Sequence, residues 1–151
     1  MPVIFITMML SQAAFAGLGS KIDTLSKDRQ ILSAKKLNVV SHNQYTVHTM
    51  KSGSSTINYY ADSNDMVFAV TWRGLAHPDL SVILDSNFGL YQSAVSAMKA
   101  QKTHSGFRGQ RHFRVASNTL VVQKAGHMRD WRGIAYDSSL IPSGVSLNEL
   151  K

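Results

Sequence analysis

Hydrophobic and polar residues in the middle of the chain follow the pattern of three consecutive β-strands. Residues 45–50 and 56–61 alternate, and residues 66–72 are apolar at nearly every position. Short polar turns at 52–55 and 62–65 separate the three stretches, and turns of this length join antiparallel neighbours. Because the third stretch is apolar on both faces, we expect it at the centre of a sheet with a helix covering one side.

The strongest helical periodicity follows directly, over residues 78–98. Spacings of three and four separate its apolar residues, which are Leu80, Ile83, Leu84, Phe88, Tyr91, Val95 and Met98. Pro78 suits the first helical turn, and the negative charge of Asp79 is favoured at a helix N-terminus. Gly89 lies inside this helix, where it costs about 1 kcal/mol relative to alanine or marks close packing.

The flanking segments give weaker signals. Residues 22–36 are amphipathic at helical spacing, and residues 37–40 fit a short strand. Residues 119–124 and 131–136 predict two further strands, whereas residues 99–118 are predicted to be a polar connection. The pattern as a whole predicts an α+β fold, in which an antiparallel sheet of about five strands packs against one long helix, with a short N-terminal helix in addition.

The first residues have the features of a signal peptide. No charged side chain precedes Lys21, and the apolar run of residues 3–10 leads to Ala14-Phe15-Ala16, the small-x-small pattern of a cleavage site. We predict a signal peptide over residues 1–16, cleavage after Ala16 and a periplasmic or secreted protein. The alternative is a buried N-terminal helix or strand. A bilayer span needs about 20 apolar residues, so we expect no transmembrane span after cleavage.

Length and composition indicate one folded domain. The chain has 151 residues, 44% of them hydrophobic and 17% charged, which is typical of a globular domain with one core. We therefore expect a single α+β domain over residues 17–151, with a loose tail from about residue 142. The chain contains no cysteine, which excludes disulfides, thiolate metal ligands, covalently attached haem and thiol nucleophiles.

The positive charge is concentrated in one region. Residues 99–132 hold eight of the 16 lysines and arginines and one of the nine acidic residues, while elsewhere the two signs cancel. Concentrated positive charge attracts anions, and interleaved aromatic residues are typical of polyanion-binding surfaces. The candidate ligand-binding residues are Arg108, Arg111, Phe113, Arg114, Lys124, His127, Arg129, Trp131 and Arg132. The alternative interpretation of this region is a solvated loop without a ligand.

The compartment selects among possible partners. An exported protein seldom meets nucleic acid, so we expect none, and an anionic envelope polymer or an acidic protein fits better. Lipopolysaccharide phosphates and acidic polysaccharides are examples of such polymers. The sequence alone does not define the oligomeric state.

The sequence lacks the common motifs of catalysis. The chain has no Gly-x-Ser-x-Gly nucleophile motif and no phosphate-binding glycine loop. Its six histidines do not pair at helical spacing, so we predict no metal site, no cofactor and no catalytic residue. The favoured hypothesis is a non-catalytic accessory or binding domain. The alternatives are an envelope-polymer hydrolase, which a pocket containing His48, His127 and an aspartate would favour, and a structural partner in a secreted complex.

Several spaced motifs resemble one known family. They are Tyr45-Thr46-Val47-His48, Val67-Phe68-Ala69-Val70-Thr71-Trp72-Arg73-Gly74, Gly126-His127-Met128-Arg129, Gly133-Ile134-Ala135-Tyr136 and Leu140-Ile141-Pro142-Ser143-Gly144-Val145. From about Leu25 onward the chain resembles the proteobacterial exported family catalogued as domain of unknown function 2844. The resemblance implies a small exported domain, and it implies no activity.

Overall fold

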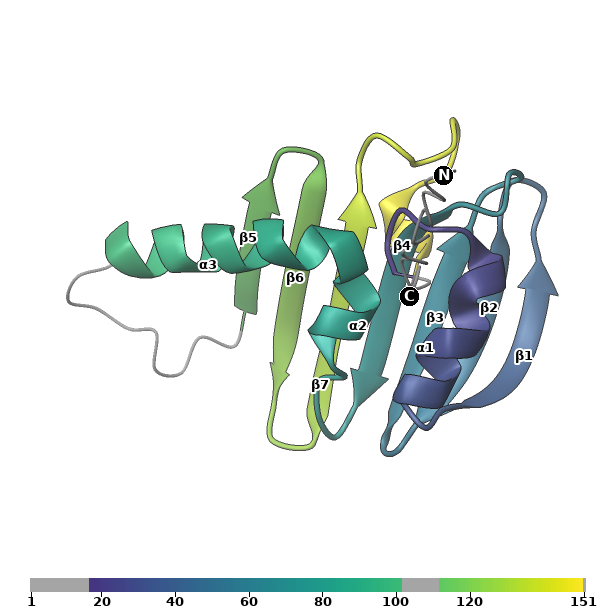
Figure 1. Ribbon diagram of the computed structural model, residues 1–151, viewed down its shortest axis with the longest axis horizontal. Coiled ribbons are helices and arrows are strands. Elements are labelled where there is room, and N and C mark those ends of the chain that lie inside the picture. Colours follow the sequence, from purple (N-terminus) through teal and green to yellow (C-terminus); the bar gives the residue numbers. More distant parts are fainter. Residues whose placement is uncertain (1–16, 102–111, 151) are drawn as a thin grey trace, which may run out of the picture.

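The computed structural model describes residues 17–101 and 112–150 (Figure 1). The signal peptide predicted over residues 1–16 lies outside the described residues, as do the candidate residues Arg108 and Arg111. Seven strands form one antiparallel sheet in the order β1-β2-β3-β4-β7-β6-β5. Their bounds are β1 (Lys35–Ser41), β2 (Thr46–Ser52), β3 (Ser55–Ala61), β4 (Val67–Gly74), β5 (His112–Ser117), β6 (Leu120–His127) and β7 (Asp130–Asp137).

The sheet consists of two meanders that meet at its centre. Strands β1 to β4 pair consecutively, strands β5 to β7 do the same, and β7 then pairs with β4. The helices lie on one face of the sheet (Figure 1). They are α1 (Leu25–Ile31), α2 (Leu80–Leu84) and α3 (Phe88–Gln101), with the short 3-10 turns η1 (Ile22–Thr24) and η2 (Asp85–Asn87). A third 3-10 turn, η3 (Leu147–Glu149), lies on the opposite face.

The predicted antiparallel sheet with helices on one face is therefore confirmed, but the prediction of about five strands is wrong. The clearest omission is β5, which falls in the stretch predicted to be a polar connection. It is an edge strand whose outward residues His112, Arg114 and Ala116 are exposed, so its apolar content is low. β1, at the other edge, was predicted only as the short stretch 37–40.

The helix predicted over residues 78–98 is interrupted after Leu84. Asp85 adopts a positive φ of 44°, which ends α2 before η2 and α3 continue the helical course. The segment at residues 17–20 passes this break. The Leu18 amide donates to the Ile83 carbonyl at 2.9 Å, and the Asn87 side-chain amide donates to the Leu18 carbonyl at 2.9 Å. The interruption thus binds the fully buried Leu18 into the core.

Hydrophobic residues are buried on both faces of the sheet. The larger cluster lies between the sheet and the helices and includes Ile57, Val70, Trp72, Ile83 and Val122. The smaller cluster, on the opposite face, consists of the buried residues Tyr60, Phe68, Ala69, Val121, Tyr136 and Leu150.

The end of the chain covers this second cluster. The prediction of a loose tail from about residue 142 is wrong, because Val145, Leu147 and Leu150 pack against the aromatic cluster and Leu150 is only 4% exposed. The segment covers one half of this face, and no element in residues 17–101 or 112–150 covers the other half.

A tryptophan packs directly on a glycine where the two meanders meet. Trp72 of β4 lies opposite Gly133 of β7 in register. A Cβ added at Gly133 would overlap the Trp72 ring and lie 2.8 Å from the Gln123 carbonyl oxygen. The absence of a side chain at Gly133 therefore allows the central strands to pair with the indole ring against them.

We predict that Gly133→Ala lowers the free energy of unfolding by about 1–3 kcal/mol, the usual cost of overpacking a core. Gly89→Ala is the matched control. A Cβ at Gly89 of α3 meets nothing within 4 Å, so this variant should gain about 0.5–1 kcal/mol of helix propensity. Urea unfolding of both variants measures the two shifts. Shifts in the same direction would contradict the packing assigned to Trp72.

Candidate functional site

On the sheet face opposite the helices, the half that the described elements leave uncovered carries two rows of mostly polar side chains. Residues paired in register across a sheet point to the same face. One row runs from β3 to β5 through Thr56, Arg73, Arg132, Ala125 and His112. The row beside it, in the same strand order, contains Asn58, Thr71, Ile134, Gln123 and Arg114.

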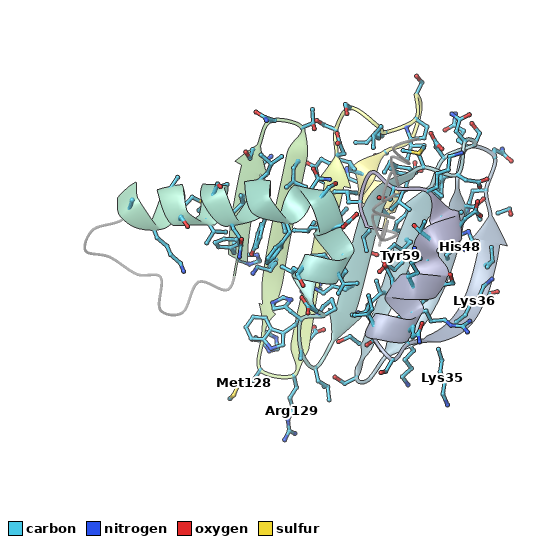
Figure 2. All side chains as sticks on the ribbon, viewed as in Figure 1. Lys35, Lys36, His48, Tyr59, Met128 and Arg129 are labelled. Carbon is cyan, nitrogen blue, oxygen red and sulfur yellow. The ribbon has the colours of Figure 1, made fainter. Side chains whose placement is uncertain are left out.

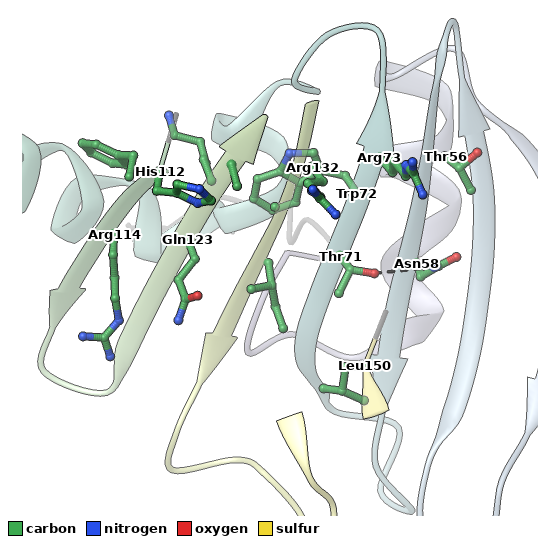
Figure 3. A pocket seen from close by; sticks show the side chains of 15 residues that line it. Thr56, Asn58, Thr71, Trp72, Arg73, His112, Arg114, Gln123, Arg132 and Leu150 are labelled. Atoms are coloured by element: carbon green, nitrogen blue, oxygen red, sulfur yellow. Dashed lines mark hydrogen bonds between the residues drawn. The ribbon is translucent and has the colours of Figure 1, made fainter. Parts of the chain in front are cut away.

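These rows line a groove of about 890 Å³ (Figure 3). The volume lies in the range of known ligand-binding pockets, about 300–1,000 Å³. Leu150 borders the groove, so the buried end of the chain separates it from the apolar half of the face. Within the groove, the Asn58 amide donates to the Thr71 hydroxyl at 3.5 Å, and the Tyr60 and Thr71 hydroxyls lie 3.3 Å apart.

Three arginines give the groove its positive charge. Arg73 and Arg132 are directly opposite each other on neighbouring strands, an arrangement that destabilises a sheet when the charges are alike. Asp130 offsets part of this repulsion, because Arg73 donates to its two carboxylate oxygens at 2.9 and 3.4 Å. The Arg73 hydrogen bond also lowers the pKa of Asp130 below its ordinary value. Arg114 and Arg132 are exposed and form no ion pair with another described residue.

Two of the predicted binding residues contact the helix layer. The Lys124 ammonium donates to the Tyr91 hydroxyl of α3 at 2.9 Å. It also lies 4.9 Å from the centre of the Phe113 ring and 5.6 Å from that of Tyr91, within the range of cation–π attraction. Lys124 and Phe113 border the groove, but the Lys124 charge is directed to the other side of the sheet.

The remaining predicted residues lie elsewhere. Trp131 packs against His77 with ring centres 4.9 Å apart, also on the helix side. His127 and Arg129 are exposed at the turn between β6 and β7. Of the nine predicted residues, the structure therefore brings Arg114 and Arg132 together on the open face of the groove.

Sequence reasoning missed the other half of the groove. The predicted site residues were taken from the basic stretch 99–132. Thr56, Asn58, Thr71 and Arg73 lie outside that stretch, and Gln123 lies inside it but is uncharged. Strand alternation could have revealed the face they share. Thr71 and Arg73 are two residues apart in β4, as are Thr56 and Asn58 in β3.

A separate cluster on the helix side joins both tryptophans of the chain to one histidine. The Trp72 indole N–H donates to His77 Nδ1 at 2.8 Å, and Trp131 contacts the same imidazole ring. An accepting Nδ1 requires the neutral imidazole. Burial lowers the pKa of His77 below its ordinary value, and the charge of Lys124 lowers it further.

We predict that tryptophan fluorescence titrates with His77. Since its folded pKa is depressed, the neutral form contributes stability above pH about 6.5, and that stability is lost as the pH falls through the lower folded pKa. Emission from the native protein should change with a midpoint below pH 6.5, and the midpoint should be absent in His77→Gln. A transition that persists in this variant would contradict the assignment.

Comparison with known proteins identifies the family. One family matches residues 14–150, nearly the whole chain. No curated protein and no solved structure matches the chain. Among the described residues, no helix is both long enough and apolar enough to span a membrane. The chain belongs to the family described as Protein of unknown function (DUF2844).

Proposed function

We propose that this protein is an exported, non-catalytic domain that binds an anionic envelope polymer in the groove on the open face of the sheet. The observation that carries the proposal is the placement of Arg73, Arg114 and Arg132 on that face. Export rests on the signal peptide expected from the sequence, and it selects polymers of the cell envelope as the candidate ligands.

The chemistry of the groove suits phosphate or carboxylate groups on a sugar chain. A guanidinium presents a planar set of N–H donors that binds either anion in a bidentate manner. The amides of Asn58 and Gln123 and the hydroxyl of Thr71 can bond to sugar hydroxyls beside the charged groups. Arg114 and Arg132 are two strands apart, about 10 Å across the sheet. This separation favours a ligand with more than one charged group.

The two histidines that would favour a hydrolase lie apart in the fold. His48 faces the helix side of β2, opposite Tyr59 in register. His127 ends β6, and three strands separate β2 from β6 in the sheet. For a structural partner we expected an exposed apolar patch beside the sheet. The exposed valines of the edge strand β1, Val39 and Val40, are consecutive and therefore point to opposite faces.

We predict that Arg114→Ala and Arg132→Ala each weaken binding to acidic polysaccharide or lipopolysaccharide about tenfold or more, since a hydrogen bond to a charged group usually contributes about 1.5–3 kcal/mol. Arg29→Ala, which removes an exposed arginine from α1, is the matched control and should leave binding unchanged. Retention of the protein on immobilised lipopolysaccharide, acidic polysaccharide and heparin across a salt series measures the effect. Absence of wild-type retention, or retention insensitive to salt, would overturn the proposal.

Asp130→Asn should have the opposite effect on binding. The amide keeps the shape of the carboxylate but removes the negative charge that occupies Arg73. We expect at least twofold tighter retention on the same polymers. The urea midpoint should change little, since exposed ion pairs contribute little to stability. Weaker retention of this variant would show that the anion does not contact Arg73.

A further inference from the structure

Exposed hydrophobic side chains gather at one end of the sheet. The three most exposed large hydrophobic residues in the described part of the chain are Met128 at 87%, Leu75 at 56% and Ile31 at 51%. They lie on three different connections, namely the β6–β7 turn, the segment after β4 and the end of α1.

The strand register places these connections at the same end. Gly74, just before Leu75, is opposite Trp131. The β6–β7 turn that carries Met128 lies one residue further along, beyond the His127–Asp130 pair. The β2–β3 turn lies at this end as well, since Ser55 pairs with Gly74. The Ser52 hydroxyl donates to the Leu32 carbonyl at 2.7 Å, which fixes the end of α1 beside that turn. We call this end of the sheet, with the four described connections named above, the basic rim.

Charged residues are also distributed unequally between the two ends of the strands, with more cations at the basic rim than at the opposite end. The basic rim carries six exposed cations against the acidic residues Asp79 and Asp130. These cations are Lys35, Lys36, Lys51, Arg73, Arg129 and Arg132. At the opposite end, the β3–β4 turn and the end of β7 carry Asp62, Asp65 and Asp137, with Lys21 beside them. Such a distribution orients the protein in an external field, with the rim toward negative charge.

The β6–β7 turn carries Met128, the most exposed of the large hydrophobic residues in the described part of the chain. Met128 and Arg129 are its two central residues, between the paired His127 and Asp130. Figure 2 shows both side chains directed away from the sheet, with Lys35 and Lys36 at the same end of the molecule. Arg129 adopts a φ of 68°, a conformation that favours glycine. An arginine therefore occupies this position at a conformational cost.

From these observations we infer that the basic rim docks on the surface of an anionic phospholipid membrane. Met128 and Leu75 enter the headgroup region, and the surrounding lysines and arginines bind lipid phosphates. Protein interfaces have a contiguous apolar centre, whereas here the apolar side chains stand on separate connections with cations between them. Arg73 and Arg132 belong to both the rim and the groove, whereas Met128 and Leu75 belong to the rim and do not line the groove, so variants of these two residues test the inference separately from the proposed function.

The experiment is sedimentation of the full chain with phosphatidylglycerol–phosphatidylcholine vesicles and with phosphatidylcholine vesicles alone. The wild type should bind the anionic vesicles and be released by salt. Met128→Asp should lower the partition coefficient about tenfold. Leu90→Asp is the matched control, because Leu90 is an exposed leucine of α3, 40% accessible and outside the rim. It should bind as the wild type does.

A second variant separates binding from folding. Arg129→Gly removes a rim cation and places glycine at the positive φ. It should raise the urea midpoint while weakening vesicle binding about fivefold, the contribution of one cation near an anionic membrane. Absence of wild-type binding to anionic vesicles, or equal losses in Met128→Asp and Leu90→Asp, would overturn the inference. Retention of Met128→Asp on acidic polysaccharide reports the groove independently.

Discussion

The pairing of β4 with β7 is the interaction on which the rest of the structure depends. It joins residues 69–74 to residues 131–136 and converts two separate meanders into one sheet. The two strands can pair with the Trp72 ring packed against them because Gly133 has no side chain that would occupy the same space. The groove lies across this junction, with Arg73 contributed by one meander and Arg132 by the other. Neither meander alone would present the two guanidinium groups side by side.

The second constraint is that this sheet buries both of its faces, but unequally. Helices cover one face completely enough to bury Ile57, Val70 and Val122. On the other face, the C-terminal segment covers only the aromatic half, where Leu150 is buried with Tyr60 and Phe68. The uncovered half is polar because strand alternation there presents threonine, asparagine, glutamine and arginine. The site is thus the part of the sheet that the described elements leave uncovered.

Local periodicity was sufficient to predict strands β2 to β4 and most of the helical region, because each of these segments carries its own hydrophobic pattern. It failed where a segment derives its structure from distant partners. β5 has polar residues at alternate positions and lacks a strong apolar pattern of its own, so it forms a strand because it pairs with β6. The C-terminal segment is ordered by aromatic residues of β3, β4 and β7. The break at Asp85 accommodates Leu18 from the start of the domain.

The residues of the site likewise fall into those that local sequence features indicated and those that only the strand pairing revealed. Charge density along the chain pointed to Arg114 and Arg132 but also to Lys124 and Trp131, which alternation places on the helix side. Arg73 was missed because it lies outside the basic stretch of the sequence, and only the pairing of β4 with β7 places it opposite Arg132. Strand order also has a consequence for folding. β7 follows the other six strands of the sheet in chain order, yet it lies at the centre of the sheet beside β4. Until it arrives, the highly apolar β4 presents an open hydrogen-bonding edge, the kind of template on which partly folded chains aggregate.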